Sequence, residues 1–326
     1  MNNKSDIRDI LKGASSMLPP SLVIDELKWK TLVRSVIRAK NVLILGPTGI
    51  GKTLAAISVA SALKRDDRFF LFNLGATQDA RSALIGNSHY HRETGTIFNE
   101  SLFIKAIRTE NAVILLDEIS RAHPDASNIL MTPLDELQRY VRLDEKEDGE
   151  IVNVANGVTF IATANVGSEY TATRVMDRAL LNRFTTTIEM SYLEKNKEKK
   201  YLVDKFNITD PIDLEILENL LSIVEHTREC VKREDSKITN CIPTRTVSAM
   251  AELIIDGFDL LEIAQIAIYP MFSDAGGVDS ERVYIKQTVQ KYIPNTTSTN
   301  PNPFKSTGKN KSNPGAATPP NQIVPF

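Results

Sequence analysis

Five short apolar runs, separated by stretches with helical spacing, constrain the fold of this 326-residue chain more than any other feature. The runs are residues 41–45 (NVLIL), 69–73 (FFLFN), 112–116 (AVILL), 158–163 (VTFIAT) and 185–190 (TTTIEM). Runs this continuous are typical of strands that are buried on both faces of a mostly parallel sheet. Because helical patterns fill the intervals, the sequence predicts an α/β fold, a three-layer sandwich around a five-stranded, mostly parallel sheet.

The character of the sequence changes after the fifth run. Several consecutive segments with helical patterns follow. The Asp210-Pro211 pair is a typical helix start, with a capping side chain before a proline in the first turn. We therefore expect an α/β domain at residues 21–190, followed by a small all-helical domain at residues 191–293.

Both ends of the chain differ from these two domains. Residues 1–20 have mixed composition and are expected to form a flexible lead-in. Residues 294–326 consist mainly of Asn, Thr, Ser, Pro, Gly and Lys, which cannot bury enough apolar surface to offset the entropy of ordering. A disordered tail is therefore predicted there. Its last five residues, QIVPF, are either a frayed end or a short peptide that docks on a partner.

Composition limits the classes of protein to which the chain can belong. An apolar fraction of 42% and a charged fraction of 25% are those of an ordinary globular protein. A net charge of −2 gives no reason to expect avid nonspecific binding to nucleic acid. No window reaches about 18 consecutive apolar residues, so no membrane span is expected, and the N-terminus lacks the apolar segment of a secretory signal. Two cysteines, Cys230 and Cys241, are too few for a disulfide framework. These features predict a cytoplasmic protein.

The strongest chemical signal is the sequence GPTGIGKT at residues 46–53, directly after the first predicted strand and at the start of a predicted helix. It fits the pattern G-x-x-x-x-G-K-[ST], in which glycines let successive backbone N–H groups point at phosphate oxygens beside the positive end of the helix. Lys52 is expected to reach the β- and γ-phosphates and Thr53 to hold Mg²⁺. The expected ligand is ATP with Mg²⁺, with GTP as the alternative. The predicted nucleotide-binding residues of the loop are Gly46, Pro47, Thr48, Gly49, Ile50, Gly51, Lys52, Thr53 and Leu54.

Polar side chains follow the third and fourth predicted strands. Asp117 and Glu118 come directly after residues 112–116. Beside the phosphate loop, Asp117 can ligate Mg²⁺ and Glu118 can polarise the attacking water. Asn165, just past the fourth strand, can orient that water against the γ-phosphate. The alternative for the two carboxylates is an acid pair on the surface.

The order of these features resembles that of an AAA+ ATPase. It runs from the phosphate loop through a strand ending in Asp-Glu, a strand ending in Asn and an Arg-Phe pair before the fifth strand to a helical lid. Residues 20–290 resemble its MoxR-type group, which includes the CbbQ/NorQ proteins and the cobaltochelatase small subunit. The more specific marks are ALIG with the following GTIFNESLFIKAI, then DEISRAHPDASN, and then VTFIATAN followed by DRALLNRF. The resemblance implies a P-loop NTPase core with a helical lid domain.

The resemblance also assigns a role to the Asn-Arg-Phe triplet. It implies that Arg183 is an arginine finger that reaches the γ-phosphate bound by a neighbouring subunit. Arg178 is a second candidate, and Asp177 could pair with either arginine. Outside this context Arg183 would be a cation at a helix end. A finger that acts on a neighbour implies a homo-oligomer, most commonly a hexameric ring.

Four further features carry roles that the resemblance implies. Arg245 lies early in a predicted lid helix, where related proteins carry a sensor-2 arginine that contacts the γ-phosphate. The alternative for Arg245 is an ordinary surface arginine. Asn73 ends the second run and resembles a residue that restrains the catalytic glutamate. Residues 84–98 resemble an insertion that often faces a central pore, and residues 141–158 resemble a hairpin that precedes the sensor-1 strand.

Three functions follow as hypotheses. The resemblance implies an ATP hydrolase that couples hydrolysis to remodelling, maturation or metal or cofactor loading of a client protein, commonly with a von Willebrand factor A domain partner. The second hypothesis is a nucleic-acid motor or loader. The sequence argues against it, because we find no winged-helix extension, zinc module or basic domain. The third is a nucleotide-dependent assembly scaffold. The complete set of Lys52, Asp117, Glu118, Asn165 and Arg183 argues against the scaffold.

Overall fold

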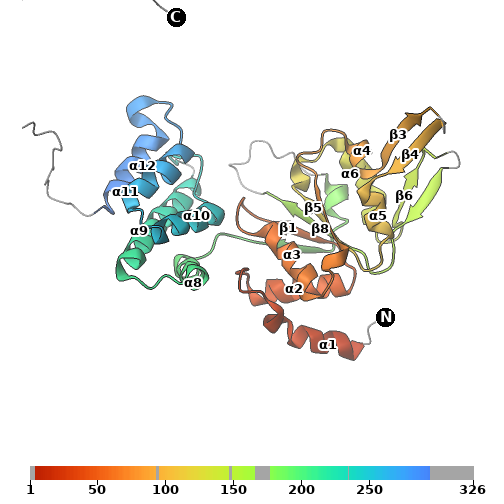
Figure 1. Ribbon diagram of the computed structural model, residues 1–326, viewed down its shortest axis with the longest axis horizontal. Helices are drawn as coiled ribbons and strands as arrows, with labels where there is room; N and C mark the ends of the chain where they lie inside the picture. Colours follow the sequence, from red (N-terminus) through yellow and green to blue (C-terminus); the bar gives the residue numbers. More distant parts are fainter. Residues whose placement is uncertain (1–3, 93–94, 147–148, 166–176, 234, 294–326) are drawn as a thin grey trace, which may run out of the picture. The chain divides into compact units, whose positions relative to one another are not determined.

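A parallel sheet of five strands, in the order β2-β5-β8-β1-β9, forms the centre of the α/β part (Figure 1). The structure is a computed structural model that describes residues 4–92, 95–146, 149–165, 177–233 and 235–293. The strands are β1 (Val42–Leu45), β2 (Phe69–Asn73), β5 (Val113–Asp117), β8 (Thr159–Ala164) and β9 (Thr186–Glu189). Each strand overlaps one of the five apolar runs, so the predicted sheet is confirmed.

Helices cover both faces of this sheet because consecutive residues of a strand point to opposite faces. On β5, Val113 and Leu115 belong to one apolar cluster, whereas Ile114 and Leu116 belong to another, and all four are fully buried. The covering helices are α2 (Glu26–Ile37) and α3 (Lys52–Ala62) on one face and α4 (Ala80–Leu84), α5 (Leu102–Arg108) and α6 (Pro124–Leu134) on the other. The three layers are those predicted from the sequence.

Two antiparallel hairpins accompany the α4–α6 layer (Figure 1). Their strands are β3 (Gly86–His91) with β4 (Gly95–Glu100), and β6 (Tyr140–Leu143) with β7 (Glu150–Asn153). Strand β3 contacts α4, β7 contacts α5 and β6 contacts α6. The two hairpins occupy the segments for which the sequence predicts an insertion and a hairpin.

Among the described residues, the chain after β9 contributes helices and no further strand. These helices are α8 (Lys195–Phe206), α9 (Pro211–Val231), α10 (Thr244–Ile255), α11 (Leu260–Ile263) and α12 (Glu281–Gln290). Helix α9 starts as predicted, because the side chain of Asp210 accepts a hydrogen bond from the amide of Ile212 at 2.7 Å. The residues up to Tyr292 form a single compact unit, and a domain boundary near residue 190 stays a prediction.

The N-terminal residues differ from the flexible lead-in expected at residues 1–20. Lys4–Lys12 form α1, and a 3-10 turn follows at Ala14–Met17. Ala14 is buried, and the indole Nε1 of Trp29 donates a hydrogen bond to its carbonyl oxygen at 2.7 Å. The segment gains its order from packing against α2, which its mixed composition does not reveal.

The predicted disordered tail, with its terminal QIVPF, lies outside the described residues. Within the residues that the structure does describe, no helix combines the length and the apolar character needed to cross a membrane.

Candidate nucleotide-binding site

The loop between β1 and α3 has the curled backbone that its glycines predict. Gly49 and Gly51 adopt φ values of +74° and +95°, a left-handed region that favours glycine. Gly46 has φ +149°, and a Cβ added there would lie 2.3 Å from the carbonyl oxygen of Met190. This position therefore tolerates only glycine, because the loop passes directly against the residue that follows β9.

Lys52 begins α3 and points back into the loop. Its Nζ donates hydrogen bonds to the carbonyl oxygens of Gly46 (2.8 Å) and Pro47 (2.6 Å) and to Oδ1 of Asn165 (2.8 Å). Burial lowers the pKa of Lys52 to about 8, although the charges of Asp117 and Glu118 act to raise it. The ammonium is therefore held in a partly desolvated position by oxygen acceptors from the loop and from the end of β8.

The two acids lie at the carboxyl end of β5. Both carboxylate oxygens of Asp117 are 3.2 Å from Oγ1 of Thr53, and Asp117 also accepts a hydrogen bond from Oγ1 of Thr163. The hydroxyl of Thr53 and the carboxylate of Asp117 are oxygen ligands of the kind that Mg²⁺ prefers. This pair fits the magnesium site predicted from the sequence.

Glu118 is placed by an unusual backbone conformation. Its φ is +56°, a left-handed value that is uncommon outside glycine, and its amide donates to Oγ1 of Thr163 at 3.0 Å. Oε2 of Glu118 lies 3.3 Å from Nη1 of Arg121. A Cβ on Gly75 would come within 3.1 Å of Cβ of Glu118, so this glycine leaves room for the glutamate.

Two asparagines end strands beside the acids. Asn165 is only 7% exposed and accepts the hydrogen bond from Lys52. Asn73 is in register with Asp117 across β2 and β5, and its Oδ1 accepts from the amide of Ala76 at 3.1 Å. Both asparagines line the same cavity as Lys52, Asp117 and Glu118.

That cavity has a volume of about 610 Å³ and combines three parts of the chain. The phosphate loop from Thr48 to Leu54 and the strand ends supply residues predicted from the sequence, whereas the predicted Gly46 and Pro47 are not among the lining residues. The others, which sequence patterns did not indicate, are Ser21, Leu22 and Val23 before α2, Thr163 on β8, and Leu193, Tyr201, Lys205, Thr244, Ser248, Ala249 and Glu252 around α8 and α10. Only the three-dimensional fold brings these residues together, because none belongs to a motif with recognisable spacing.

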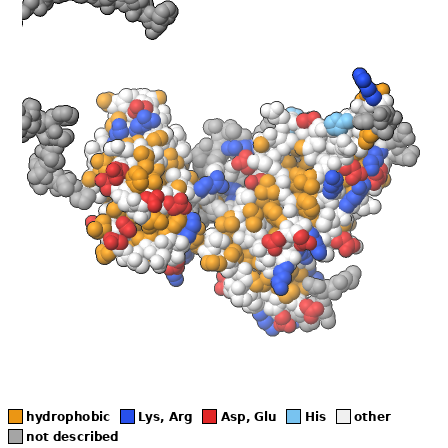
Figure 2. Space-filling view, in the orientation of Figure 1, with side chains coloured by type: hydrophobic (Ala, Val, Ile, Leu, Met, Phe, Trp, Pro, Cys, Tyr) orange, Lys and Arg blue, Asp and Glu red, His pale blue; other side chains and the backbone are white. Residues whose placement is uncertain are grey.

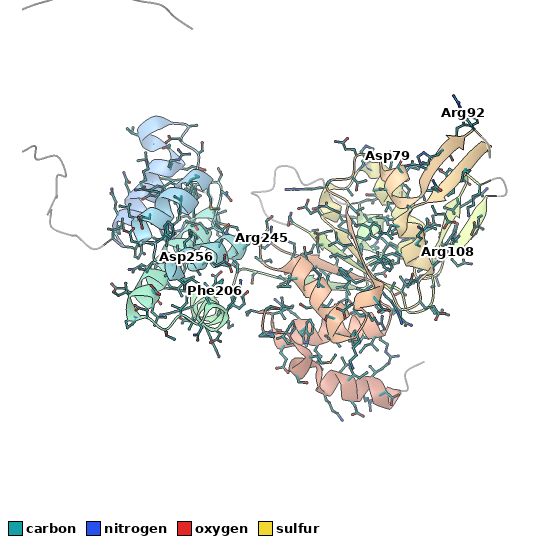
Figure 3. All side chains as sticks on the ribbon, in the orientation of Figure 1. Asp79, Arg92, Arg108, Phe206, Arg245 and Asp256 are labelled. Atoms are coloured by element: carbon teal, nitrogen blue, oxygen red, sulfur yellow. The ribbon has the colours of Figure 1, made fainter. Side chains whose placement is uncertain are left out.

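Arg245 reaches this cavity from the start of α10 (Figure 3). Its amide donates a hydrogen bond to the carbonyl oxygen of Gly49 at 3.1 Å, and its side chain is exposed. Its charge contributes to the lowered pKa of Lys52, after the larger effect of burial. Arg245 therefore lies beside the phosphate loop, at the edge of the candidate site.

Arg183 is not among the residues that line this cavity. Its Nη2 is 3.2 Å from Oδ2 of Asp135, and its Nε is buried without a hydrogen-bond partner in the described part of the chain. Arg178 is exposed at the start of α7 (Arg178–Leu181). Asp177 caps that helix by accepting a hydrogen bond from the amide of Ala179 at 2.9 Å, and in the described part of the chain it forms an ion pair with neither Arg178 nor Arg183. The loop before it, residues 166–176, is not among the described residues.

The loop between β1 and α3 is rich in glycine, and a lysine, a threonine and a strand-end aspartate converge with it on one cavity. These features define a P-loop nucleotide-binding protein. Residues 41–184 match the AAA domain (dynein-related subfamily). The chain is 31% identical over 224 residues to BssE of Thauera aromatica, which is named as a candidate chaperone, and this match covers 68% of the chain and 72% of BssE. The chain belongs to the AAA+ ATPase family.

Other relatives are similar to smaller parts of this chain. An uncharacterised protein of Staphylococcus saprophyticus is 30% identical over 197 residues, which is 60% of this chain and 70% of that protein. The chaperone protein ClpB of Lactococcus lactis is 31% identical over 186 residues, which is 55% of this chain and 20% of ClpB. Proteins named as chaperones thus occur among the relatives of this chain.

Proposed function

We propose that this protein hydrolyses ATP with Mg²⁺ and uses the energy to remodel a client protein. The observation that carries the proposal is the convergence of Lys52, Thr53, Asp117, Glu118 and Asn165 on one cavity at the carboxyl ends of β1, β5 and β8. The amides of the phosphate loop and the N-terminus of α3 favour bound phosphate.

Each of these residues has a defined part in the reaction. Lys52 exchanges its loop and Asn165 acceptors for oxygens of the β- and γ-phosphates. Thr53 and Asp117 would hold Mg²⁺, which when bound would neutralise charge on the phosphates. Glu118 accepts a hydrogen bond from the attacking water and polarises it, and Asn165 orients that water toward the γ-phosphate. Arg245 stabilises the γ-phosphate from the start of α10.

The proposal includes a ring, most commonly a hexamer of the MoxR type. Arg183 lies outside its own cavity and is partly exposed, which is compatible with a finger that acts on the nucleotide of a neighbour. To reach the nucleotide of the neighbouring subunit, the guanidinium of Arg183 must break its ion pair with Asp135. An arginine supplied in this way is worth roughly 10³-fold or more in kcat in related phosphoryl transfer.

Remodelling of a client is favoured over the other functions by the relatives, since BssE and ClpB are both named as chaperone-type proteins. The two hairpins provide a surface that is distinct from the nucleotide cavity. A von Willebrand factor A domain partner and metal or cofactor loading of the client belong to the same proposal.

The experiment is an ATPase assay against protein concentration, with the mass followed by light scattering, for the wild type and for Arg183→Ala. We expect the specific rate to rise as the ring forms, and Arg183→Ala to assemble and bind ATP while its kcat falls roughly 10³-fold. Arg178→Ala, at the start of α7, tests the second candidate for the finger in the same assay. Full activity of a monomer, or unchanged rates in both Arg183→Ala and Arg178→Ala, would exclude a site shared between subunits.

A further inference from the structure

A buried ion pair joins α8 to α9. The guanidinium of Arg228 binds the carboxylate of Glu198 through two hydrogen bonds, from Nη1 to Oε2 at 2.6 Å and from Nη2 to Oε1 at 3.1 Å. Arg228 is 7% exposed and Glu198 is 1% exposed. The guanidinium also lies over the ring of Tyr192, with Cζ 4.3 Å from the ring centroid. A buried ion pair is stable only when its remaining polar groups also form hydrogen bonds. The remaining donors of Arg228 therefore need acceptors nearby.

Those donors hold the segment that leads into α10. Nε of Arg228 donates to the carbonyl oxygen of Ile242 at 3.0 Å, and Nη2 donates to Oγ1 of Thr244 at 3.4 Å. The neighbouring residue on α9, Thr227, accepts a hydrogen bond from the amide of Ile242 at 3.3 Å. Two consecutive residues of α9 therefore fix the backbone on which α10 begins, and α8, α9 and α10 contact one another (Figure 1).

The same segment makes the contact with the phosphate loop. Directly after Thr244, the amide of Arg245 donates to the carbonyl oxygen of Gly49. A Cβ on Gly49 would lie only 2.9 Å from Cβ of Pro243, so the loop and the segment are closely packed. Any displacement of residues 242–244 therefore displaces Arg245 relative to Gly49.

Through its contact with the ring of Tyr192, Arg228 also packs against the segment that leaves the sheet. Tyr192 follows two residues after Met190, whose amide donates to the carbonyl oxygen of Leu45 at 2.8 Å at the end of β1. Arg228 thus stands where four segments meet, namely the exit from β9, α8, α9 and the start of α10. It does not line the nucleotide cavity.

We infer that Arg228 is a positioning residue for ATP hydrolysis, which holds the start of α10 so that Arg245 stays beside the phosphate loop. The inference rests on the proposed function. The role requires an arginine because its planar fork binds a carboxylate and further oxygens in fixed directions, whereas the ammonium of lysine is a point charge.

The test is a double-mutant cycle between Arg228→Lys and Arg245→Ala. Two quantities are measured for each protein, the kcat for ATP and the Kd for a fluorescent ATP analogue. Arg228→Lys retains a cation beside Glu198, and thermal melts establish that each variant is folded. If Arg228→Lys does not fold, the paired variant Glu198→Met/Arg228→Met replaces it, since it leaves no unpaired buried charge. Arg233→Lys, which changes an exposed arginine just beyond α9, is the matched control.

We expect Arg228→Lys to lower kcat by about tenfold to a hundredfold, because small misplacements of groups at the reacting phosphate have effects of this size. Adding Arg245→Ala to Arg228→Lys should lower kcat little further, since both changes remove the same contribution. The control should retain the wild-type kcat.

The inference would be overturned if the effects of Arg228→Lys and Arg245→Ala on kcat add independently, or if folded Arg228→Lys keeps the wild-type kcat. Either result would leave the proposed function intact. Wild-type protein that binds the analogue without hydrolysing ATP would overturn the proposed function, and the cycle in Kd would then decide whether Arg228 positions Arg245. Wild-type protein that binds no nucleotide would overturn both.

Discussion

At the scale of single residues, Lys52 is a partly desolvated cation in the candidate phosphate site. Its Nζ donates to two carbonyl oxygens of its own loop and to Asn165, and burial lowers its pKa to about 8. Anionic phosphate oxygens beside Nζ favour the charged form and raise this pKa. We therefore expect nucleotide binding to be coupled to protonation of Lys52.

We expect proton uptake when nucleotide binds at pH 8. With a pKa near 8 in the free protein, Lys52 is about half neutral at pH 8, so the uptake is about 0.5 proton per nucleotide, and it falls to about 0.1 at pH 7. The affinity for nucleotide should fall as the pH rises above 8. Calorimetric titrations in two buffers with different ionisation enthalpies measure the uptake directly.

Lys52→Arg is the control, because a guanidinium keeps the charge and does not titrate in this range. Equal uptake by the wild type and by Lys52→Arg would assign the coupling to another group.

The lowered pKa of Lys52 also determines how its contribution to the free energy of unfolding changes with pH. Because the pKa of Lys52 in the folded protein lies below 10.5, the unfolded chain binds more protons between about pH 8 and pH 10.5. The contribution of Lys52 to stability therefore becomes more favourable as the pH rises through this window.

Sequence patterns locate some residues of the site and cannot locate others. Lys52 and Asp117 stand at fixed places relative to apolar strands, so their convergence follows from the parallel sheet. Arg228 and Glu198 lie 30 residues apart on different helices, and nothing in their spacing distinguishes them from the many exposed charges of this segment. Their burial depends on how the helices pack, which composition does not specify.

At the scale of elements, a closed set of four charges fastens the two hairpins together. Arg108, at the end of α5 (Figure 3), binds Glu100 at 2.6 Å and Glu150 at 2.5 Å, and Lys146 binds the same two carboxylates at 2.7 Å and 2.5 Å. Figure 2 shows basic and acidic side chains gathered over this end of the α/β part. We call these four residues the ionic clasp, and each base in it bridges β4 to β7.

The clasp should hold only over a defined range of pH. Hydrogen bonding to Glu100 and Glu150 raises the pKa of Lys146, so its contribution is complete below pH 10.5 and is lost as the pH rises through the higher folded pKa. Hydrogen bonding to Lys146 lowers the pKa of Glu150, so that contribution is present above pH 4.5 and is lost as the pH falls through the lower folded pKa.

We expect Lys146→Met to loosen β6 and β7 without unfolding the protein. Hydrogen exchange at residues 140–153 should be faster than in the wild type at pH 7, and 1 M salt should bring the two closer, because the Debye length then falls to about 3 Å. Lys105→Met, an exposed lysine of α5, is the matched control. Exchange that is unchanged in Lys146→Met would mean that apolar packing alone holds the hairpin.

The elements differ in how far the sequence predicts them. The central strands β1, β5 and β8 were predictable because they are buried on both faces and so carry continuous apolar runs. The edge strands β2 and β9 are partly exposed, and their place in the alternation of strands and helices predicted them. The ordered α1 was not predictable, since Ile7 is the one buried residue among its described side chains and its helix depends on contacts with α2. The resemblance indicates an insertion at residues 84–98 and a hairpin at residues 141–158, but the charges that fasten the two observed hairpins come from three separate segments.

At the scale of the whole molecule, the nucleotide cavity is the place where distant parts of the chain meet. Its lining includes residues 21–23, the carboxyl ends of the sheet, and residues of α8 and α10. A ligand that fills it contacts all these parts at once. Binding should therefore stabilise the α/β part and the helices after β9 together, rather than the phosphate loop alone.

We expect nucleotide to raise the Tm of the described unit as a single transition. A ligand that binds only the folded state at a concentration of 100 Kd stabilises it by about 2.7 kcal/mol. At about 2–4 °C per kcal/mol for a chain of this size, the Tm should rise by about 5–10 °C. Differential scanning calorimetry of Glu118→Gln with ATP and Mg²⁺ measures this shift without turnover. Lys52→Met should show little shift, and chelation of Mg²⁺ should reduce it. If two transitions appear and only one moves with nucleotide, the helices after β9 take no share in binding, and Arg245 loses its proposed role.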